Sequence, residues 1–383
     1  MFGSREPGAG SREPGAGSRE PGAGSFNNKF NILKAFGIMA VVGGHCGINF
    51  LSWFPVYSFH MPLFIFISGY LFHDKDFLSF LKSKGKHLVV PFLLWNLFFG
   101  LLCALFHHYG IISFGSALSL KTLFVDPFTH GHQFVFNCPT WFVGTLIEVQ
   151  FSYWILYRVC RKNHIALTML TMLLYLAAWT MGDNHWHWIY GNGMLAVEKV
   201  LFCLIFYECG VVYRLYIEKK DFFSVNRIAG LILFNGFLLG FVSRRITMGI
   251  AWMDMPHQIL LPLVTALSGI YFCLQMAELL KDKVPRNSLL GYIGEHTFSI
   301  MTLHLFFFWL LNTVFWKLKE IGIFPLRSFN YDKYMHDIYF RVTEHAPVVN
   351  SFYFLAGLFG SLLCVYLYER FAAPCFKKYF RFL

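Results

Sequence analysis

Two ionisable side chains lie eleven residues apart in the first long apolar stretch of the sequence, FNILKAFGIMAVVGGHCGINF. Because a helix turns by about 100° per residue, Lys34 and His45 fall on one stripe, about 16 Å apart along the axis. A histidine can take a proton from a hydroxyl and return it to a leaving group, as a general base does in group transfer. The structural alternative is that Lys34 extends to the membrane edge and His45 hydrogen-bonds to a neighbouring helix.

A second histidine follows one short loop later, in FHMPLFIFISGYLF. His60 has a similar expected depth to His45, so two imidazoles can face one site. Pro62 in the same stretch predicts that the helix kinks or starts at Met61-Pro62. The small Ser68-Gly69 pair favours close helix contact over a serine nucleophile, for which no orienting third residue can be placed. We predict that His45, His60 and Lys34 form the catalytic group.

A basic segment, DFLSFLKSKGKHLVVP, precedes the third apolar stretch. Spaced lysines at a membrane edge can hold the phosphates of a nucleotide-like cofactor as point charges. They equally follow the rule that cytoplasmic loops keep positive charge. The candidate cofactor-binding residues are Lys82, Lys84, Lys86 and His87.

Three further residues are candidates for substrate binding: Glu148 in WFVGTLIEVQF, Trp141 at the start of that stretch, and His304 in GEHTFSIMTLHLFFFWL. Ionisable groups inside a membrane are costly, which makes each a functional candidate, whereas a tryptophan at a membrane edge is expected in any case. The loops containing His130, His132 and the segment GDNHWHWIYGN suit contact with sugars or with lipid headgroups.

The elements that must position these side chains are membrane-spanning helices. Of 383 residues, 56% are hydrophobic and 14% charged, and the mean hydropathy is +0.50, which is far too apolar for a soluble domain. About 20 apolar residues cross about 30 Å of hydrocarbon. Ten such stretches occur, at 30–49, 56–72, 88–107, 141–159, 165–181, 195–216, 228–243, 258–279, 289–315 and 350–370. The predicted fold class is an all-α integral membrane protein with about ten transmembrane helices.

The distribution of Lys and Arg predicts the orientation of these helices. With the N-terminus inside, the cytoplasmic loops and the C-terminal segment hold 18 of these residues and the opposite loops hold 8, so both termini are predicted to be cytoplasmic. The net charge of +11 then requires no nucleic-acid partner. The nine cysteines show no Cys-x-x-Cys or Cys/His spacing, and we expect neither a disulfide nor a metal.

Several motifs occur in the order seen in membrane acyltransferase family 3: Lys34-x10-His45, FHMPLFIFISGYLF, the basic segment ending in Pro91, WFVGTLIEV and GEHTFSIMTLH. The chain most closely resembles the branch of stand-alone sugar O-acetyltransferases, the fucose 4-O-acetylase-like proteins. The resemblance covers nearly all of the chain after residue 26 and defines residues 26–383 as a membrane acyltransferase domain.

The resemblance implies a ten-helix enzyme whose essential first-helix histidine falls on His45. Lys34 stands where the family usually has arginine, which keeps the charge but loses the bidentate fork. The family's Arg-x-x-Arg falls on Lys84 and His87, a larger departure that puts phosphate binding there in doubt. The chain ends about 13 residues after its last apolar stretch, so acceptor recognition is expected from the helices and outer loops.

The expected activity is O-acetyl transfer from cytoplasmic acetyl-CoA to a hydroxyl of a surface or lipid-linked glycan, such as O-antigen, capsule or another exopolysaccharide. The expected location is the bacterial inner membrane, where membrane lipids are further partners. The competing interpretation is a polytopic transporter or flippase for a lipid-linked sugar, since ten helices and intramembrane charge are equally typical of one. The two halves of the chain show no self-similarity that would favour it.

Residues 1–25 form a leader built on three copies of SREPGAG, at Ser4 to Gly24, with the composition of a disordered segment or a designed linker. Tandem copies of the seven nucleotides AGCCGGG also translate as Ser-Arg-Glu-Pro-Gly-Ala-Gly. A repeated DNA tract that gains or loses seven-base units shifts the reading frame. We therefore hypothesise that expression of the enzyme switches on and off at random, as suits one that alters a bacterial surface.

Overall fold

The computed structural model describes residues 27–50, 52–243, 246–322, 328–344 and 346–372, so the leader at 1–25 lies outside it. All regular structure in these ranges is helical, and the one β-type pairing there is an isolated bridge between Gly249 and Asp254. This confirms the predicted all-α fold class.

Each of the ten predicted stretches coincides with a helix. The principal helices are α1 (Asn28–Cys46), α2 (Val56–Tyr70), α4 (Val90–His108), α7 (Trp141–Val159), α8 (His164–Asp183), α10 (Asn192–Val212), α11 (Val225–Phe237), α12 (Leu261–Leu280), α14 (Thr297–Glu320) and α16 (Ala346–Leu355). Adjoining or connecting them are α3 (Phe77–Lys84), α5 (Leu120–Phe124), α6 (Asp126–Thr129), α9 (Trp186–Tyr190), α13 (Leu289–Glu295), α15 (Tyr331–His336) and α17 (Ser361–Leu367). π-Helical turns at Gly85–Val89, Tyr213–Ile217, Leu238–Val242, Ala356–Gly360 and Tyr368–Ala372 extend several of them.

Six helical segments of the described chain are long and apolar enough to cross a membrane, which identifies a multi-pass membrane protein. They are Phe77–His108, His164–Asp183, Val225–Val242, Leu261–Leu280, Thr297–Glu320 and Ala346–Phe371. The other four predicted stretches fall on α1, α2, α7 and α10, which pack against one another, and the first three of these helices carry half of the candidate residues. Such helices tolerate polar side chains because they face protein rather than lipid. The count of ten and the cytoplasmic termini stay predictions.

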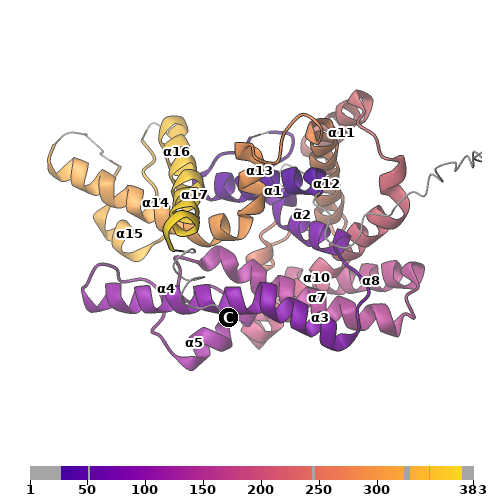
Figure 1. The fold of residues 1–383 in the computed structure, drawn as a ribbon, viewed down its shortest axis with the longest axis horizontal. Coiled ribbons are helices and arrows are strands. Elements are labelled where there is room, and N and C mark those ends of the chain that lie inside the picture. Colours follow the sequence, from indigo (N-terminus) through magenta and orange to yellow (C-terminus); the bar gives the residue numbers. More distant parts are fainter. Residues whose placement is uncertain (1–26, 51, 244–245, 323–327, 345, 373–383) are drawn as a thin grey trace, which may run out of the picture.

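The arrangement places α1 and α2 in the middle of the molecule (Figure 1). α3 and α4 form one long rod, whose α3 part packs against α7 through Phe80, while α14, α16 and α17 lie to the left of α1 in this view. The stretch 289–315, predicted as one helix, is divided at His296 into α13 and α14. α13 packs against the first half of α1, where a Cβ on Gly294 would lie 2.2 Å from the Asn31 carbonyl oxygen.

α1 has sequence-encoded ends. The side chain of Asn27 accepts a hydrogen bond from the Phe30 N–H at the start, and Gly47 ends the helix in the left-handed conformation, with φ of 77°. α2 begins at Val56 and continues through Pro62, so the helix does not start at Met61-Pro62. Packed transmembrane helices tolerate an internal proline because neighbouring groups satisfy the freed backbone.

α2 and α10 approach each other closely at two glycines. A Cβ on Gly69 would lie 1.9 Å from the carbonyl oxygen of Tyr207, and a Cβ on Gly210 would lie 2.0 Å from that of Phe66. No larger residue fits without moving a helix, which confirms close helix contact at the Ser68-Gly69 pair. This contact fixes α2, and therefore His60, against the centre of the molecule.

Candidate active site

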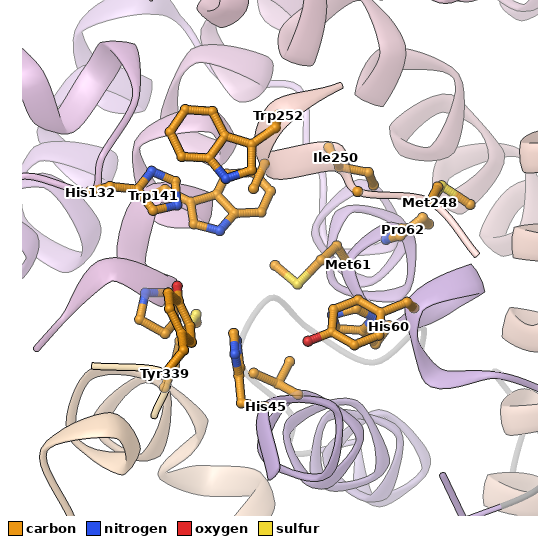
Figure 2. A pocket seen from close by; sticks show the side chains of 16 residues that line it. His45, His60, Met61, Pro62, His132, Trp141, Met248, Ile250, Trp252 and Tyr339 are labelled. Atoms are coloured by element: carbon orange, nitrogen blue, oxygen red, sulfur yellow. The ribbon is translucent and has the colours of Figure 1, made fainter. Parts of the chain in front are cut away.

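A cavity of about 100 Å³ lies at the C-terminal end of α1, and we call it the histidine cavity. Side chains from α1, α2, α7, α14 and three loops converge on it (Figure 2). The rings in its wall are those of His45, Tyr57, His60, His132, Trp141, Trp252 and Tyr339. The fold thus brings together three of the residues predicted from sequence, His45, His60 and Trp141.

His45 is surrounded by other rings. Its ring centroid lies 5.2 Å from that of His304 on α14 and 5.8 Å from that of Tyr339, with the tyrosine plane tilted by only 19°. Tyr57 meets it edge-on at 6.5 Å. His304, predicted as a substrate-binding residue, therefore lies beside the predicted catalytic base.

Hydrogen bonds fix the tautomers of the two histidines nearest His45. Nδ1 of His60 lies 2.5 Å from the carbonyl oxygen of Val56, and Nδ1 of His304 lies 3.0 Å from that of Ile300. A carbonyl only accepts, so each Nδ1 carries the proton and each neutral ring leaves Nε2 as an acceptor. Nε2 of His304 is buried and has no partner among the described residues. A hydrogen-bond acceptor is thus presented next to His45.

Loop residues complete the wall of the histidine cavity. Tyr339 follows α15, and its hydroxyl lies 2.7 Å from the Cys138 sulfur; burial raises the pKa of Tyr339, so the phenol stays protonated. His132 stacks on Trp252, with ring centroids 4.6 Å apart. Burial lowers the pKa of His132 to about 4, so its ring is neutral at physiological pH. The loop side of the cavity is therefore aromatic and uncharged.

A second, larger cavity of about 380 Å³ lies further along α2 and α7, and we call it the lysine cavity. Lys84 and His87, both predicted to bind a cofactor, line it. The π-helical turn Gly85–Val89 lies between α3 and α4, where it changes the helical register of the basic segment. Lys82 and Lys86 are exposed and lie outside the lining.

The polar part of the lysine cavity includes a serine and a glutamine. Nε2 of Gln150 donates a hydrogen bond to Ser68 Oγ at 2.7 Å. Oε1 of Gln150 is buried, and no partner for it occurs in the part of the chain that the structure describes. A buried acceptor without a partner is costly, so this amide oxygen is available to a donor group on a ligand.

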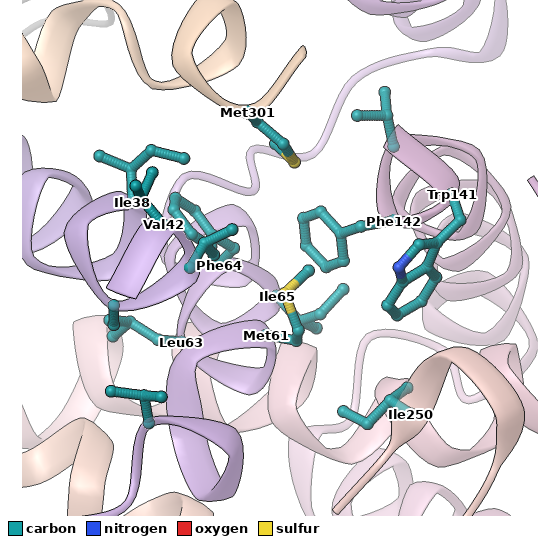
Figure 3. Packing of buried hydrophobic residues seen from close by; sticks show 14 of the residues in the cluster. Ile38, Val42, Met61, Leu63, Phe64, Ile65, Trp141, Phe142, Ile250 and Met301 are labelled. Atoms are coloured by element: carbon teal, nitrogen blue, oxygen red, sulfur yellow. The ribbon is translucent and has the colours of Figure 1, made fainter. Parts of the chain in front are cut away.

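The two cavities are separated by apolar side chains. Met301 on α14 lines both of them. Phe64 and Phe142, with ring centroids 5.9 Å apart, line the lysine cavity beside it. Figure 3 shows these side chains packed with Met61 and Trp141, which line the histidine cavity. Only a thin apolar layer, named here the Met301 layer, divides a cationic chamber from a histidine chamber.

Neither cavity is lined by Lys34, Glu148 or His304, nor by the exposed Lys82 and Lys86. Lys34 is half-buried on α1. Glu148 on α7 has a buried Oε2 with no partner among the described residues. Behind Trp141, Nζ of Lys199 donates to the Thr129 carbonyl at 2.8 Å and lies 5.2 Å from the indole centroid. The sequence analysis did not select Lys199. Like Glu148, it is an ionisable residue within a predicted membrane span, so the same rule applies to it.

The other residues that line the histidine cavity could not be predicted from sequence motifs. Tyr339, Trp252 and Tyr57 lie in loops or at a helix start, where aromatic residues are common at a membrane edge. Met301 belongs to an apolar run in which no residue stands out. Nothing in the local sequence distinguishes these positions from lipid-facing ones.

These features define a helical membrane protein with a buried histidine site and a separate cationic chamber. Comparison with family models shows that residues 27–370 match an acyltransferase domain. The chain therefore belongs to acyltransferase family 3 and is a membrane acyltransferase. No curated protein and no solved structure matches it.

Proposed function

We propose that this membrane acyltransferase is an O-acetyltransferase that uses cytoplasmic acetyl-CoA and acetylates a hydroxyl of a surface glycan. One observation carries the proposal: a cationic cavity and a histidine cavity meet at Met301. A bulky anionic donor and an uncharged hydroxyl acceptor would each find a chamber of suitable chemistry, on the two sides of Met301.

The donor fits the lysine cavity by charge and polarity. Lys84 and His87 can hold its phosphates, with the exposed lysines Lys82 and Lys86 adding positive charge at the approach. The pantetheine arm carries amide N–H groups, for which Oε1 of Gln150 is an available acceptor. The thioester then reaches the Met301 layer, and passage of the acetyl group requires Met301 to change rotamer. Lys34, half-buried on α1, adds charge near this path.

The histidine cavity supplies the base. The acceptor hydroxyl gives its proton to His45 as its oxygen attacks the thioester carbonyl carbon, and a new C–O bond replaces the C–S bond. His45 then returns the proton to the departing thiolate. His304 is assigned to positioning the base: its Nε2 is an unpartnered acceptor in the ring next to His45, and a hydrogen bond donated to it by one His45 nitrogen during the reaction would leave the other nitrogen free to take the proton. His60 and Trp141, which line the histidine cavity, are assigned to binding the acceptor, and Glu148, outside both linings, receives no role.

The proposed acceptor is O-antigen, capsule or another exopolysaccharide at the bacterial inner membrane.

The heptapeptide leader supports a second proposal, that expression of the gene switches on and off at random. Sequencing the gene from many sibling colonies checks the switching. We expect copy numbers that differ in single seven-base units. Codons that break the seven-base period, or an invariant copy number, would contradict it.

Transfer of labelled acetyl tests the activity itself. Purified protein is incubated with radiolabelled acetyl-CoA and extracted glycans, and compared with His45→Ala. Removal of a general base costs about 1,000-fold in rate, so the label should appear in glycan only with the wild-type chain. Equal labelling by both proteins, or none by either, contradicts the proposal; ATP-independent movement of lipid-linked sugar without labelling would favour the flippase instead.

A further inference from the structure

An apolar groove of about 420 Å³ lies on the face of α1 away from the lysine cavity, and we call it the aromatic groove. Its walls come from α1, α2, α12 and the loop between α1 and α2, and all its lining side chains are apolar. Phe36 and Met39 contribute from α1, Phe50 and Phe54 from the loop, and Phe272 from α12. In a bilayer such a groove accommodates hydrocarbon.

The groove face of α1 leads to a guanidinium group. Phe36, Ala40, Gly43 and Gly47 follow one another at helical spacing along one stripe. A Cβ on Gly43 would lie 2.7 Å from the ring of Phe50, a groove residue. One turn further, a Cβ on Gly47 would lie 3.0 Å from Nη1 of Arg341 and 3.3 Å from Nδ2 of Asn350. Two N–H donor groups therefore lie together beside Gly47, on the stripe of α1 that borders the groove.

Arg341 has no acidic partner in the part of the chain that the structure describes. Its Nη1 is buried, without a partner among the described residues. The salt bridges among the described residues do not include it, and its charge acts on His45 and Tyr57, which line the histidine cavity. A buried guanidinium with a free N–H favours a phosphate oxygen.

The groove and the histidine cavity share a helix. Val56 and Phe59 of α2 line the groove, while the neighbouring Tyr57 and His60 line the histidine cavity. A molecule with its hydrocarbon in the groove and its phosphate at Arg341 would therefore have its next group beside His45. An ordinary phospholipid would place only its headgroup there.

We propose that Arg341, Asn350 and the aromatic groove bind the polyprenyl phosphate carrier of a lipid-linked glycan. This rests on the proposed function and names its substrate class: the acceptor is acetylated while still attached to its lipid. The phosphate bonds to the guanidinium and the amide, the isoprenoid chain lies in the groove, and the glycan extends into the histidine cavity. Membrane anchoring then holds the hydroxyl near His45 without a separate sugar-binding domain.

Binding of undecaprenyl phosphate tests this site. Full-length protein in detergent micelles is titrated with undecaprenyl phosphate or with phosphatidylglycerol, and bound lipid is counted by native mass spectrometry. We expect the polyprenyl phosphate to bind about tenfold more tightly than phosphatidylglycerol. Arg341→Gln should weaken it about tenfold, which corresponds to loss of one charge-assisted contact. Met39→Trp, which fills the groove, should weaken it similarly.

Leu173→Trp is the matched control, because Leu173 is a 63% exposed residue on α8, outside the groove lining. Leu173→Trp should leave the affinity for undecaprenyl phosphate unchanged. A thermal unfolding midpoint equal to that of the wild type shows that each variant is folded. Equal affinity of Arg341→Gln and Met39→Trp with wild type, or equal binding of phosphatidylglycerol, overturns the lipid site. If acetyl transfer depends on His45 in that case, only the lipid site fails. If the variants lose lipid but the wild type transfers no acetyl group, the proposed function fails and the lipid site stands.

Discussion

The histidine cavity and the lysine cavity differ in size, charge and wall chemistry although one methionine borders both. The histidine cavity is small, about 100 Å³, and seven aromatic or imidazole rings lie in its wall. Burial keeps two of these rings, those of His132 and Tyr339, neutral. The lysine cavity is larger, about 380 Å³, and is lined by a lysine, a histidine and an amide. Under the proposed function, a charged donor would bind in one of these environments and a hydroxyl would be deprotonated in the other, where each would not disturb the other.

After His45→Ala, the substitution that we expect to lower the turnover number most is at His304. His304→Phe keeps a ring of similar shape but removes the Nε2 acceptor beside His45. We expect the turnover number to fall about 100-fold, with the Michaelis constant for acetyl-CoA unchanged, because only the orientation of the base is lost. Initial rates with labelled acetyl-CoA measure both constants.

A purely structural role for His304 predicts a different pattern. His304→Gln supplies an amide oxygen as the acceptor, so partial recovery of turnover relative to His304→Phe is expected if His304 positions His45. If His304→Phe and His304→Gln have the same turnover number and the same lowered thermal unfolding midpoint, His304 contributes only to packing.

The sequence was sufficient to predict the helices and one part of the wall of each cavity. His45 and His60 end and begin helices joined by one short loop, so their proximity followed from connectivity. Lys84 and His87 belong to one segment. The other walls come from distant parts of the chain: Met301, Tyr339 and Gln150 approach only through tertiary packing, which periodicity does not encode. The division of stretch 289–315 also escaped prediction, although Gly294, Glu295 and His296 interrupt the apolar run at that point.

The next effect concerns the Met301 layer. Met301→Trp adds bulk between the cavities, so we expect turnover to fall about 30-fold while acetyl-CoA still binds, since a small displacement of the reacting groups is costly. Met301→Ala widens the layer and should let butyryl-CoA serve as a donor more efficiently than it does with the wild type. Parallel assays with acetyl-CoA and butyryl-CoA measure this. If both variants keep the wild-type rate and donor preference, the acetyl group does not pass Met301.

The smallest effect separates the lysines that line a cavity from those that merely follow membrane topology. Lys84 lines the lysine cavity, whereas Lys86, two residues away, is exposed outside it. Lys84→Ala should therefore raise the Michaelis constant for acetyl-CoA about tenfold with little change in turnover, because a phosphate contact acts on binding in the ground state and the transition state alike. Lys86→Ala is the matched control, because it removes the same charge. It should change the Michaelis constant for acetyl-CoA less than twofold, since an exposed charge interacts only weakly. Equal effects of the two substitutions would mean that the donor senses only the net charge of the segment, and the lysine cavity would then lose its assignment as the donor chamber while the histidine cavity kept its own.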